Sequence, residues 1–405
     1  MGAQLMPSLV QSWLEATGYE DISQRAKGHD RLEIHAERDG VPLIVEIEKR
    51  GSGVGIADLI DGNTELAMMA RQPNAQEIDA AWQLGDLRSP DQEFVVALDG
   101  ITAIVHASNP VRQLSIEQLR AIYAGTIRNW SELGGPNLPI RLHVGSPRMG
   151  SGEFFRQVVM AASRLALHTG VQASVTQVAA AIAGDPAAIG IVGLRSRVSN
   201  RSRPLAISNG GFAAYPTTMA ILTEDYPLTR RYSLYGGQLM SALGRSFALY
   251  SVTRRAQEAV AAAGHFAVTL RPTQQAPLLS TNIEYTRLVA GAQRLPLSLR
   301  FNLAGTQSIF DSRAACDLER LVAFMRFPQN RSRHAVVVAF GKPETGGPLV
   351  STLISNDRAD MVAGYLLERG IVVRSANGLG TAHPLAAPAQ KGARFRNERV
   401  EVWLL

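Results

Sequence analysis

The 405-residue sequence contains a single cysteine, Cys316, so neither an intrachain disulfide nor a cysteine-based metal cluster can form within it. Cys316 lies in an apolar helical pattern, and we expect it to pack as a small hydrophobic side chain. The eight histidines are dispersed, without an HExxH or H-x-H pair, which argues against a metal site. No apolar run reaches the roughly 18 residues that span a bilayer. We expect no metal and no other cofactor.

The charge pattern offers little support for nucleic-acid binding. The net charge of +6 is carried mainly by arginines. There is no Lys/Arg run, no zinc-finger spacing and no aromatic-plus-glycine ribonucleoprotein motif. Scattered arginines are typical of a solvated surface. We therefore expect no nucleic-acid partner, and small anionic ligands remain compatible with the charge.

The chain opens on an amphipathic helix. Leu5, Leu9 and Trp13 share one face, and Gly18 is a suitable stop. No signal peptide precedes this helix. Because an α/β domain that starts on a helix lacks its first strand, we expect that strand to lie before Met1.

Strands and helices then alternate to about residue 270. Residues 32–48 alternate in strand fashion, and residues 114–125 predict a capped helix. The long apolar segment 93–106 is interrupted at Asp99-Gly100, where we expect the chain to cross between two lobes. The alternation predicts a mostly parallel sheet.

A second, smaller pattern follows. The segment "RPTQQAPLLS" has two prolines and no periodicity, which is typical of a linker. Beyond it the sequence predicts a small α+β unit, including a helix that begins near Ser355 and stops at Gly370. We therefore expect a domain over 1–270, a linker over 271–294 and a domain over 295–405.

Two Gly/Ser turns precede helical stretches, "GSGVG" at 51–55 and "GSG" at 150–152. Helix N-termini expose unpaired N–H groups and partial positive charge, so they bind anions well. Arg71 and Arg148 would add bidentate donors. Either turn alone is more typical of an ordinary glycine loop than of an anion site, because short glycine motifs are weak signals.

Four blocks around these turns occur in a specific order: "GSGVGIADLIDGNTELAMMAR", "VRQLSIEQLRAIYAGTIRNWSELGG", "RMGSGEFF" and "EDYPLTRRYSLY". Together they resemble the periplasmic phosphate-binding proteins of ABC importers, over about residues 2–270. The resemblance implies a two-lobed α/β periplasmic-binding fold of type 2, closing on phosphate or a related oxyanion between helix N-termini. It also implies a periplasmic location and an ABC importer as partner.

The resemblance assigns an oxyanion site residue by residue. The matching positions in the two lobes are Ser52, Gly53, Arg71, Arg148, Ser151 and Gly152. The threonine that follows Ser-Gly in the family is Glu153 here. A carboxylate facing phosphate costs several kcal/mol unless it is protonated or turned away. Glu153 is thus either a ligand residue for a different solute or a sign of a degenerate site.

The end of the chain has a second resemblance. "ISNDRADMVAGYLLERGI" and "GLGTAHPLAAPAQKGARFRNERVEV" resemble the C-terminal domain of the OmpA family, over about residues 295–404. This resemblance implies a small α+β domain that binds peptidoglycan through the diaminopimelate of its stem peptides. Arg358 matches the ligand arginine, expected in the first turn of its helix, and Glu344 stands at the aspartate position. Arg358 is equally well explained as a surface residue paired with Asp357 or a neighbouring acid.

The closing motif of that resemblance is incomplete. "RFRNERVEV" keeps Asn397, Arg399 and Glu401 but has Glu398 in place of an arginine. The segment "GKPE" also replaces the family's Gly-His-Thr-Asp. The resemblance therefore implies the fold more strongly than it implies wall binding.

Three classes of function follow. The leading hypothesis is a periplasmic solute-binding protein for phosphate or a related oxyanion, tethered to peptidoglycan and without enzymatic activity. The alternative is a non-transport scaffold or adhesion protein of the cell envelope with a degenerate anion site. A serine-dependent phosphatase would need a base beside Ser52 or Ser151, and no histidine lies near either serine in sequence.

Overall fold

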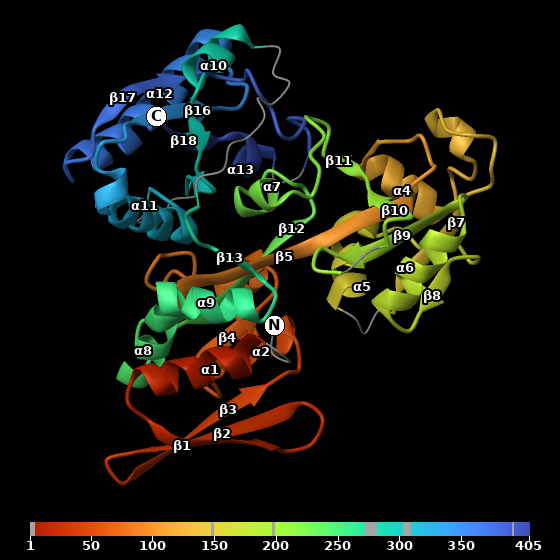
Figure 1. Ribbon diagram of the computed structural model, residues 1–405. Coiled ribbons are helices and arrows are strands. Elements are labelled where there is room, and N and C mark those ends of the chain that lie inside the picture. The colour runs from red at the N-terminus through yellow and green to blue at the C-terminus, as the bar shows by residue number, and fades with distance from the viewer. Residues whose placement is uncertain (1–4, 147–149, 197–198, 272–281, 303–308, 391–392) are drawn as a thin grey trace. The chain divides into compact units, whose positions relative to one another are not determined.

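The computed structural model describes residues 5–146, 150–196, 199–271, 282–302, 309–390 and 393–405 (Figure 1). The chain forms two compact units. Unit 1 comprises Met1–Leu98, Arg230–Arg271 and Leu297–Ser332, and unit 2 comprises Asp99–Thr229, Pro272–Pro296 and Arg333–Leu405. Within the described ranges, every helix is too short or too polar to cross a membrane.

Unit 1 combines helices with two groups of strands. Its elements are α1 (Leu5–Ala16), β1 (Glu20–Ala26), β2 (Arg31–Arg38), β3 (Val41–Glu48), α2 (Ser52–Ile60), β4 (Leu66–Met69), α3 (Ala75–Ala80), η1 (Trp82–Leu84), the first part of β5 (Glu93–His106), β12 (Thr229–Gly236), α8 (Ala242–Ser251), α9 (Arg254–Ala262), β13 (Phe266–Ala267), β15 (Leu299–Arg300), α11 (Ser312–Met325) and η4 (Pro328–Asn330).

The core of unit 1 forms around the N-terminal helix. Leu5, Leu9 and Trp13 are buried on one face of α1, as the sequence predicts. They pack with residues of β2, β3, β5, β12, α8 and α9. Gly18, at φ +80°, ends the helix in a conformation that glycine adopts without strain. The prediction of this helix and of its buried face is confirmed.

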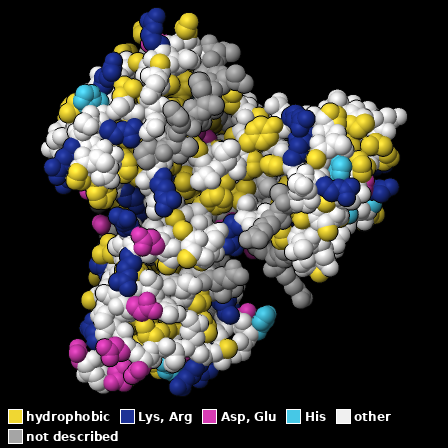
Figure 2. Space-filling view, viewed as in Figure 1, with side chains coloured by type: hydrophobic (Ala, Val, Ile, Leu, Met, Phe, Trp, Pro, Cys, Tyr) yellow, Lys and Arg dark blue, Asp and Glu magenta, His cyan; other side chains and the backbone are white. Residues whose placement is uncertain are grey.

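The antiparallel sheet β1–β2–β3 has one face on this core and one face in solvent. Acidic side chains gather over this sheet in Figure 2. The exposed acidic residues of its strands include Glu20, Glu37, Glu46 and Glu48. Several form ion pairs with neighbouring basic side chains, as Glu46 does with Arg31. This face has the mixed charge of an ordinary solvated sheet surface.

Unit 2 holds the rest of the chain. Its elements are the second part of β5, β6 (Gln113–Ser115), α4 (Ile116–Ala124), η2 (Trp130–Leu133), β7 (Arg141–Gly145), α5 (Gly150–Phe155), the π-helical turn η3 (Arg156–Met160), β8 (Gly170–Gln172), α6 (Val175–Gly184), β9 (Ala188–Gly193), β10 (Ser202–Pro204), β11 (Ala206–Ser208), α7 (Thr218–Leu222), α10 (Ile283–Leu288), β14 (Gln293–Arg294), β16 (Ala335–Phe340), α12 (Pro348–Leu367), β17 (Val373–Gly378), α13 (Ala393–Asn397) and β18 (Arg399–Leu404).

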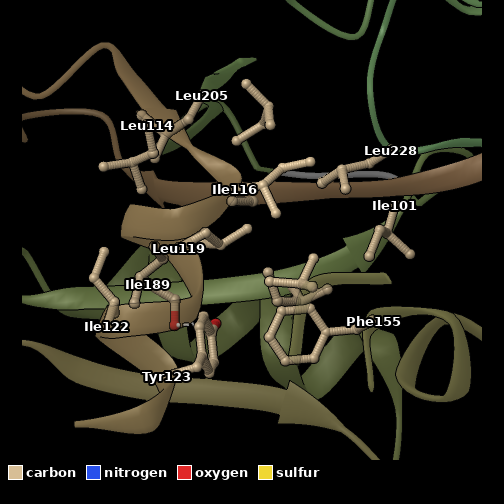
Figure 3. Close-up of a cluster of buried hydrophobic side chains, with 14 of the residues drawn as sticks. Ile101, Leu114, Ile116, Leu119, Ile122, Tyr123, Phe155, Ile189, Leu205 and Leu228 are labelled. Carbon is tan, nitrogen blue, oxygen red and sulfur yellow. Dashed lines mark hydrogen bonds between the residues drawn. The ribbon is translucent and has the colours of Figure 1, made fainter. Parts of the chain in front are cut away.

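Helix α4 organises the first core of unit 2 (Figure 3). Its capping box, Ser115 with Gln118, and its left-handed C-cap at Gly125 agree with the sequence prediction. The buried face of α4 includes Tyr123, whose ring lies edge-on to Phe155, with ring centroids 4.8 Å apart. The Tyr123 hydroxyl donates to the backbone oxygens of His143 and Ile189, which ties α4 to β7 and β9.

The sheets are mixed, so the prediction of a mostly parallel sheet is wrong. In unit 1, β4 pairs antiparallel with β12, and β5 pairs antiparallel with β13. In unit 2, β7 pairs parallel with β8 and β9, while β5 pairs antiparallel with β9 and β10. Both β5 and β12 change unit along their length, so neither is part of a local strand–helix–strand repeat, on which the prediction rested.

The C-terminal region, residues 282–405, departs from the sequence prediction in two ways. The segment expected to be a linker contains α10 and β14, and β14 pairs with β18; residues 272–281 lie outside the described part. The region is also not one contiguous domain, because residues 297–332 group with unit 1 and the remainder with unit 2.

Helix α12 begins at Pro348, seven residues before the predicted start. Ser355, expected near its N-terminus, instead donates its hydroxyl to the backbone oxygen of Thr352 inside the helix, at 2.9 Å. In unit 2, β16 pairs parallel with β17 and antiparallel with β18, giving the order β14–β18–β16–β17.

Candidate functional site

In unit 1, the chain reaches the start of α2 through Gly51, whose φ of +96° favours glycine. Ser52 begins the helix, and its hydroxyl accepts a hydrogen bond from the Ala70 N–H at 3.0 Å. Since a hydroxyl that accepts still has its own proton to donate, Ser52 is able to donate to an anion. The contact also holds the start of α2 against the end of β4.

Arg71, which follows that strand, lies beside the same loop. A Cβ placed on Gly53 would sit 3.7 Å from its Nη2 atom. The guanidinium forms a bidentate pair with Glu77, at 2.7 Å from Nη1 to Oε2 and 2.6 Å from Nη2 to Oε1. Arg71 thereby holds the pKa of Glu77 below its ordinary value, against the opposing effect of burial.

Glu77 is fixed in turn by the N-terminus of α3. It forms a capping box with Asn74: each side chain accepts from the other residue's backbone N–H, at 2.8 and 2.9 Å. The structure therefore brings Ser52, Gly53 and Arg71 together and adds a carboxylate to them. A helix N-terminus, a hydroxyl and a guanidinium in one place can bind an oxyanion, and Glu77 both orients the guanidinium and offsets part of its charge.

In unit 2, the second Gly/Ser turn lies on α5. A Cβ on Gly152 would approach the backbone oxygens of Ser146 and Gly145 to 2.4 and 2.7 Å, so only glycine is accommodated there without a shift. Ser151 is partly exposed. Arg148 lies outside the described residues, so its predicted role stays a prediction.

The departure at Glu153 has a simple local explanation. The side chain is exposed, and its Oε1 atom accepts from Gln157 Nε2 one turn further on, at 3.1 Å. An exposed carboxylate with a neutral partner does not bear the desolvation penalty of one buried beside an anion. Its predicted role in ligand binding stays untested.

The block "IRNWSELGG" supports the structure rather than a ligand. Trp130 is fully buried, and its indole N–H donates to the Ala187 oxygen at 2.9 Å. Asn129 and Glu132 form a capping box, and Gly134 closes the turn in the left-handed region. The motif is thus a folded turn whose tryptophan anchors it to the core of unit 2.

Arg358 lies in the interior of α12 and is buried, so the prediction of an exposed residue in the first turn is wrong. Its partner is also not Asp357. The guanidinium pairs with Glu398 at 2.7 Å, and the same carboxylate accepts from Arg394 at 2.9 Å. Glu344 pairs with Lys342 at 2.8 Å.

The residues of the closing motif that match the OmpA-family pattern make structural contacts in this chain. Asn397 accepts from the N–H groups of Leu385 and Ala386 and donates to the Ala386 oxygen. Glu401 is buried with Arg294 and Arg399, each at 3.1 Å. These contacts satisfy buried polar groups and fix the loop before β18.

Residues 8–255, more than half of the chain, match the family model described as the PBP superfamily domain. The chain belongs to the PBP superfamily. Its fold is therefore the two-lobed α/β fold of periplasmic binding proteins, as the sequence predicts for this part.

Relatives within the superfamily are distant. A protein named phosphate-binding protein PstS from Staphylococcus aureus is 24% identical over 250 residues, covering 58% of this chain and 75% of its own. Among solved structures, an ABC-type phosphate transport receptor from Vibrio cholerae is 24% identical with a TM-score of 0.46, covering 53% of this chain and 84% of its own. PstS from Borrelia burgdorferi is 21% identical with a TM-score of 0.46, over 53% and 84% of the two chains.

Two residues at these sites were missed by sequence reasoning. Glu77 had a local signal, the Asn74-x-x-Glu77 spacing of a capping box. Glu398 was noticed only as a departure from a motif, and its contact with Arg358 joins residues 40 positions apart. Within the described ranges no group of three His, Cys, Asp or Glu residues is placed to hold a metal.

Proposed function

We propose that this PBP-superfamily chain is a periplasmic solute-binding protein for phosphate or a related oxyanion, which it would deliver to an ABC importer. The observation that carries the proposal is the convergence of Ser52, Gly53 and Arg71 at the start of α2. These groups supply a hydroxyl, backbone N–H groups and a guanidinium, which are the donors an oxyanion requires. The name and similarity of the S. aureus relative support phosphate as the first ligand to test.

Ser151 and Gly152 of unit 2, together with Arg148, are proposed as a second set of oxyanion-binding residues. Gly152 permits the close approach of α5 to the end of β7. Glu153 is included because it directly follows Ser151 and Gly152. We propose that its charge affects which anion binds, without direct contact between the carboxylate and the anion.

Calorimetry with phosphate, and with sulfate as a second oxyanion, tests this function. We expect phosphate to bind, and Arg71→Ala to weaken binding by about 2 kcal/mol, roughly 30-fold, through loss of a charge-assisted contact. Arg88→Ala is the matched control, because Arg88 forms a comparable pair with Asp86 at 3.0 Å elsewhere in unit 1. Absence of heat with both anions, or equal losses in the two variants, would refute the proposal.

For the C-terminal region, the order β14–β18–β16–β17 with α12 between β16 and β17 supports an OmpA-like fold. Tethering to peptidoglycan stays a prediction. The two residues proposed to bind peptidoglycan already have ionic partners: Arg358 pairs with Glu398, and Glu344 pairs with Lys342. These pairs favour the alternative in which an inherited fold serves as a scaffold or docking module of the cell envelope.

Sedimentation of the full chain with diaminopimelate-type peptidoglycan separates the two alternatives. A tether predicts co-sedimentation that Glu344→Gln reduces, whereas a scaffold predicts none. Since Glu344 is on a loop and its partner Lys342 is two residues away, this variant should leave the fold intact.

A further inference from the structure

Unit 2 contains an arginine whose positive charge has no acidic partner. Arg203 lies on β10 and is opposite Val105 of β5 in the antiparallel pairing of these two strands (Figure 1). Its side chain is partly buried, and no carboxylate among the described residues forms an ion pair with it. Because a guanidinium stays protonated in proteins, the charge of Arg203 is uncompensated within this part of the chain. An unpaired charge that is partly removed from water is unfavourable.

The hydrogen bonds of Arg203 explain its position but use only one nitrogen of the guanidinium. Nη2 donates to the backbone oxygens of Asn109 and Val111, in the loop that follows β5. Nε and Nη1 are buried and have no hydrogen-bond partner among the described residues. A buried donor without an acceptor costs about 1–3 kcal/mol, and more where the group is charged. A role in holding this loop would therefore leave most of the guanidinium unsatisfied.

A second donor without an acceptor lies in the same loop. Asn109 is only 2% exposed. Its Oδ1 atom accepts from the Val111 N–H at 2.9 Å, while Nδ2 has no acceptor within the described ranges. The amide cannot be turned around to improve this, because an amide nitrogen does not accept a hydrogen bond from an N–H group. The loop thus adds a neutral donor to the charged donors of Arg203, and both residues lack an acceptor.

Arg112 brings a second positive charge to this place. Burial lowers the pKa of Arg203, and the nearby charge of Arg112 lowers it further, while Tyr215 has the opposite effect. The Arg112 side chain is exposed. Tyr215 is 45% exposed, and its hydroxyl lies 3.5 Å from the Arg112 backbone oxygen. Exposed side chains change rotamer within nanoseconds, so these two neighbours can move aside and admit a small ligand to Arg203.

We propose that Arg203, Arg112 and Asn109 bind a small, doubly charged oxyanion of the sulfate or phosphate type. The oxygens of such an ion are acceptors for the N–H groups on Arg203 Nε, Arg203 Nη1 and Asn109 Nδ2, and bonds from a guanidinium to an oxyanion are charge-assisted. Its negative charge also offsets the repulsion between the two arginines. None of these residues belongs to the sets assigned above to the solute, so the inference does not depend on the proposed function.

Nitrogen-15 NMR of the full chain during titration with sodium sulfate tests the site. Sodium chloride holds the ionic strength constant, so that general screening does not change. The signals of Arg203 Nε–H and Asn109 Nδ2 are assigned by their loss in Arg203→Lys and Asn109→Asp. We expect both signals to shift and to saturate with the same midpoint. The indole N–H signal of Trp130, which donates to the Ala187 oxygen inside the core of unit 2, is the internal reference and should stay in place.

Two variants and a matched control sharpen the test. Arg112→Gln removes an exposed charge and should weaken sulfate binding roughly fivefold while leaving the fold intact. Asn109→Asp places a carboxylate in the loop beside Arg203, so it should abolish the saturable shift and raise the thermal midpoint. Arg120→Gln is the control, because Arg120 is another partly buried arginine of unit 2 whose Nε donates to a backbone oxygen, that of Val159. It should change sulfate affinity by less than about twofold.

Shifts that grow linearly without saturation would overturn the site, and so would parent-like sulfate affinity in folded Arg112→Gln or Asn109→Asp. Equal weakening in Arg120→Gln would reduce the effect to net charge and would overturn it as well. The proposed solute site in unit 1 is tested separately, because Arg71→Ala should leave the sulfate response of Arg203 Nε–H unchanged. Loss of that response in Arg71→Ala would assign the bound anion to unit 1 and remove the second site.

Discussion

Arg71 in unit 1 and Arg358 in unit 2 each pair with a glutamate at nearly the same distance, 2.6 and 2.7 Å. Their surroundings differ. The side chains of Arg71 and Glu77 are 29% and 17% exposed, whereas those of Arg358 and Glu398 are 8% and 1% exposed. The first pair is reached by water and by small solutes, and the second is almost entirely enclosed.

The difference decides what each arginine can do. A partly exposed guanidinium can exchange one carboxylate for another anion at modest cost, because water stabilises the displaced group. A buried one cannot, because the displaced carboxylate would remain desolvated. Pairing alone therefore does not identify a ligand arginine, and exposure of the partner separates the two cases.

The largest expected effect is on the enclosed pair. Arg358→Ala leaves the Glu398 carboxylate buried, with Arg394 as its remaining basic partner among the described residues, so we expect it to lower the free energy of unfolding by about 3–5 kcal/mol. Urea denaturation measures this. Arg358→Met with Glu398→Leu should recover most of the loss, and an unchanged midpoint for Arg358→Ala would show that the pair is not enclosed.

The buried side chain of His383 in unit 2 should make the free energy of unfolding depend on pH. His383 stacks on Phe212, with ring centroids 4.1 Å apart. Burial, with a further contribution from Arg399 and an opposing one from Glu401, lowers its pKa from 6.5 to about 4. Between these values the unfolded state binds the proton more readily, so stability is complete above pH 6.5 and falls as the pH approaches 4.

The loss attributable to His383 reaches at most about 3 kcal/mol. Denaturation of the parent and of His383→Gln at a series of pH values measures it. The variant should have the flatter profile between pH 6.5 and 4, and parallel profiles would contradict the assignment.

A smaller effect is expected at the open pair. Glu77→Gln keeps a hydrogen-bond acceptor for Arg71 but removes the competing charge, so phosphate affinity should increase by about 1 kcal/mol, roughly fivefold. Calorimetry measures the change. Weaker binding would mean that the orientation of Arg71 by the carboxylate outweighs the competition.

The smallest effect is expected at Glu153. Because this carboxylate is exposed and paired with Gln157, Glu153→Thr should tighten phosphate binding by at most about 0.5 kcal/mol. A collapse of affinity would make Glu153 a ligand residue and would point to a solute with a donor or cationic group.

Much of the fold follows from local sequence. The buried face of α1, the Ser115 capping box of α4 and the crossing near Asp99 are encoded within a few residues, and all were predicted. The start of α12 was missed although Gly347-Pro348 is a good start signal, with proline at the first helical position. Ser355 and Asn356 gave a second start signal, because serine and asparagine are common at helix N-termini. In the folded protein both residues lie inside α12, so tertiary packing outweighs this local preference.

The proximity of the candidate residues was predictable where it depends on order along the chain and not where it depends on distant packing, and their role in binding an anion stays a prediction. Family order placed Ser52, Gly53 and Arg71 together. It gave no information on Glu398 as the partner of Arg358, because that contact depends on how α12 packs beside the segment preceding β18. Burial, which distinguishes Arg358 from Arg71, is a tertiary property.

The division of unit 1 into three chain segments has a consequence for its biosynthesis. The Glu93–Ser312 hydrogen bond joins residues 219 positions apart, so unit 1 cannot be complete until residue 312 has left the ribosome. Phe94, Val96 and Ala97 on β5 belong to the core that α8 and α9 later cover. We expect this apolar strand to be the main binding site for a chaperone during synthesis. The strand stays exposed to solvent until the residues that cover it, much later in the sequence, have been synthesised.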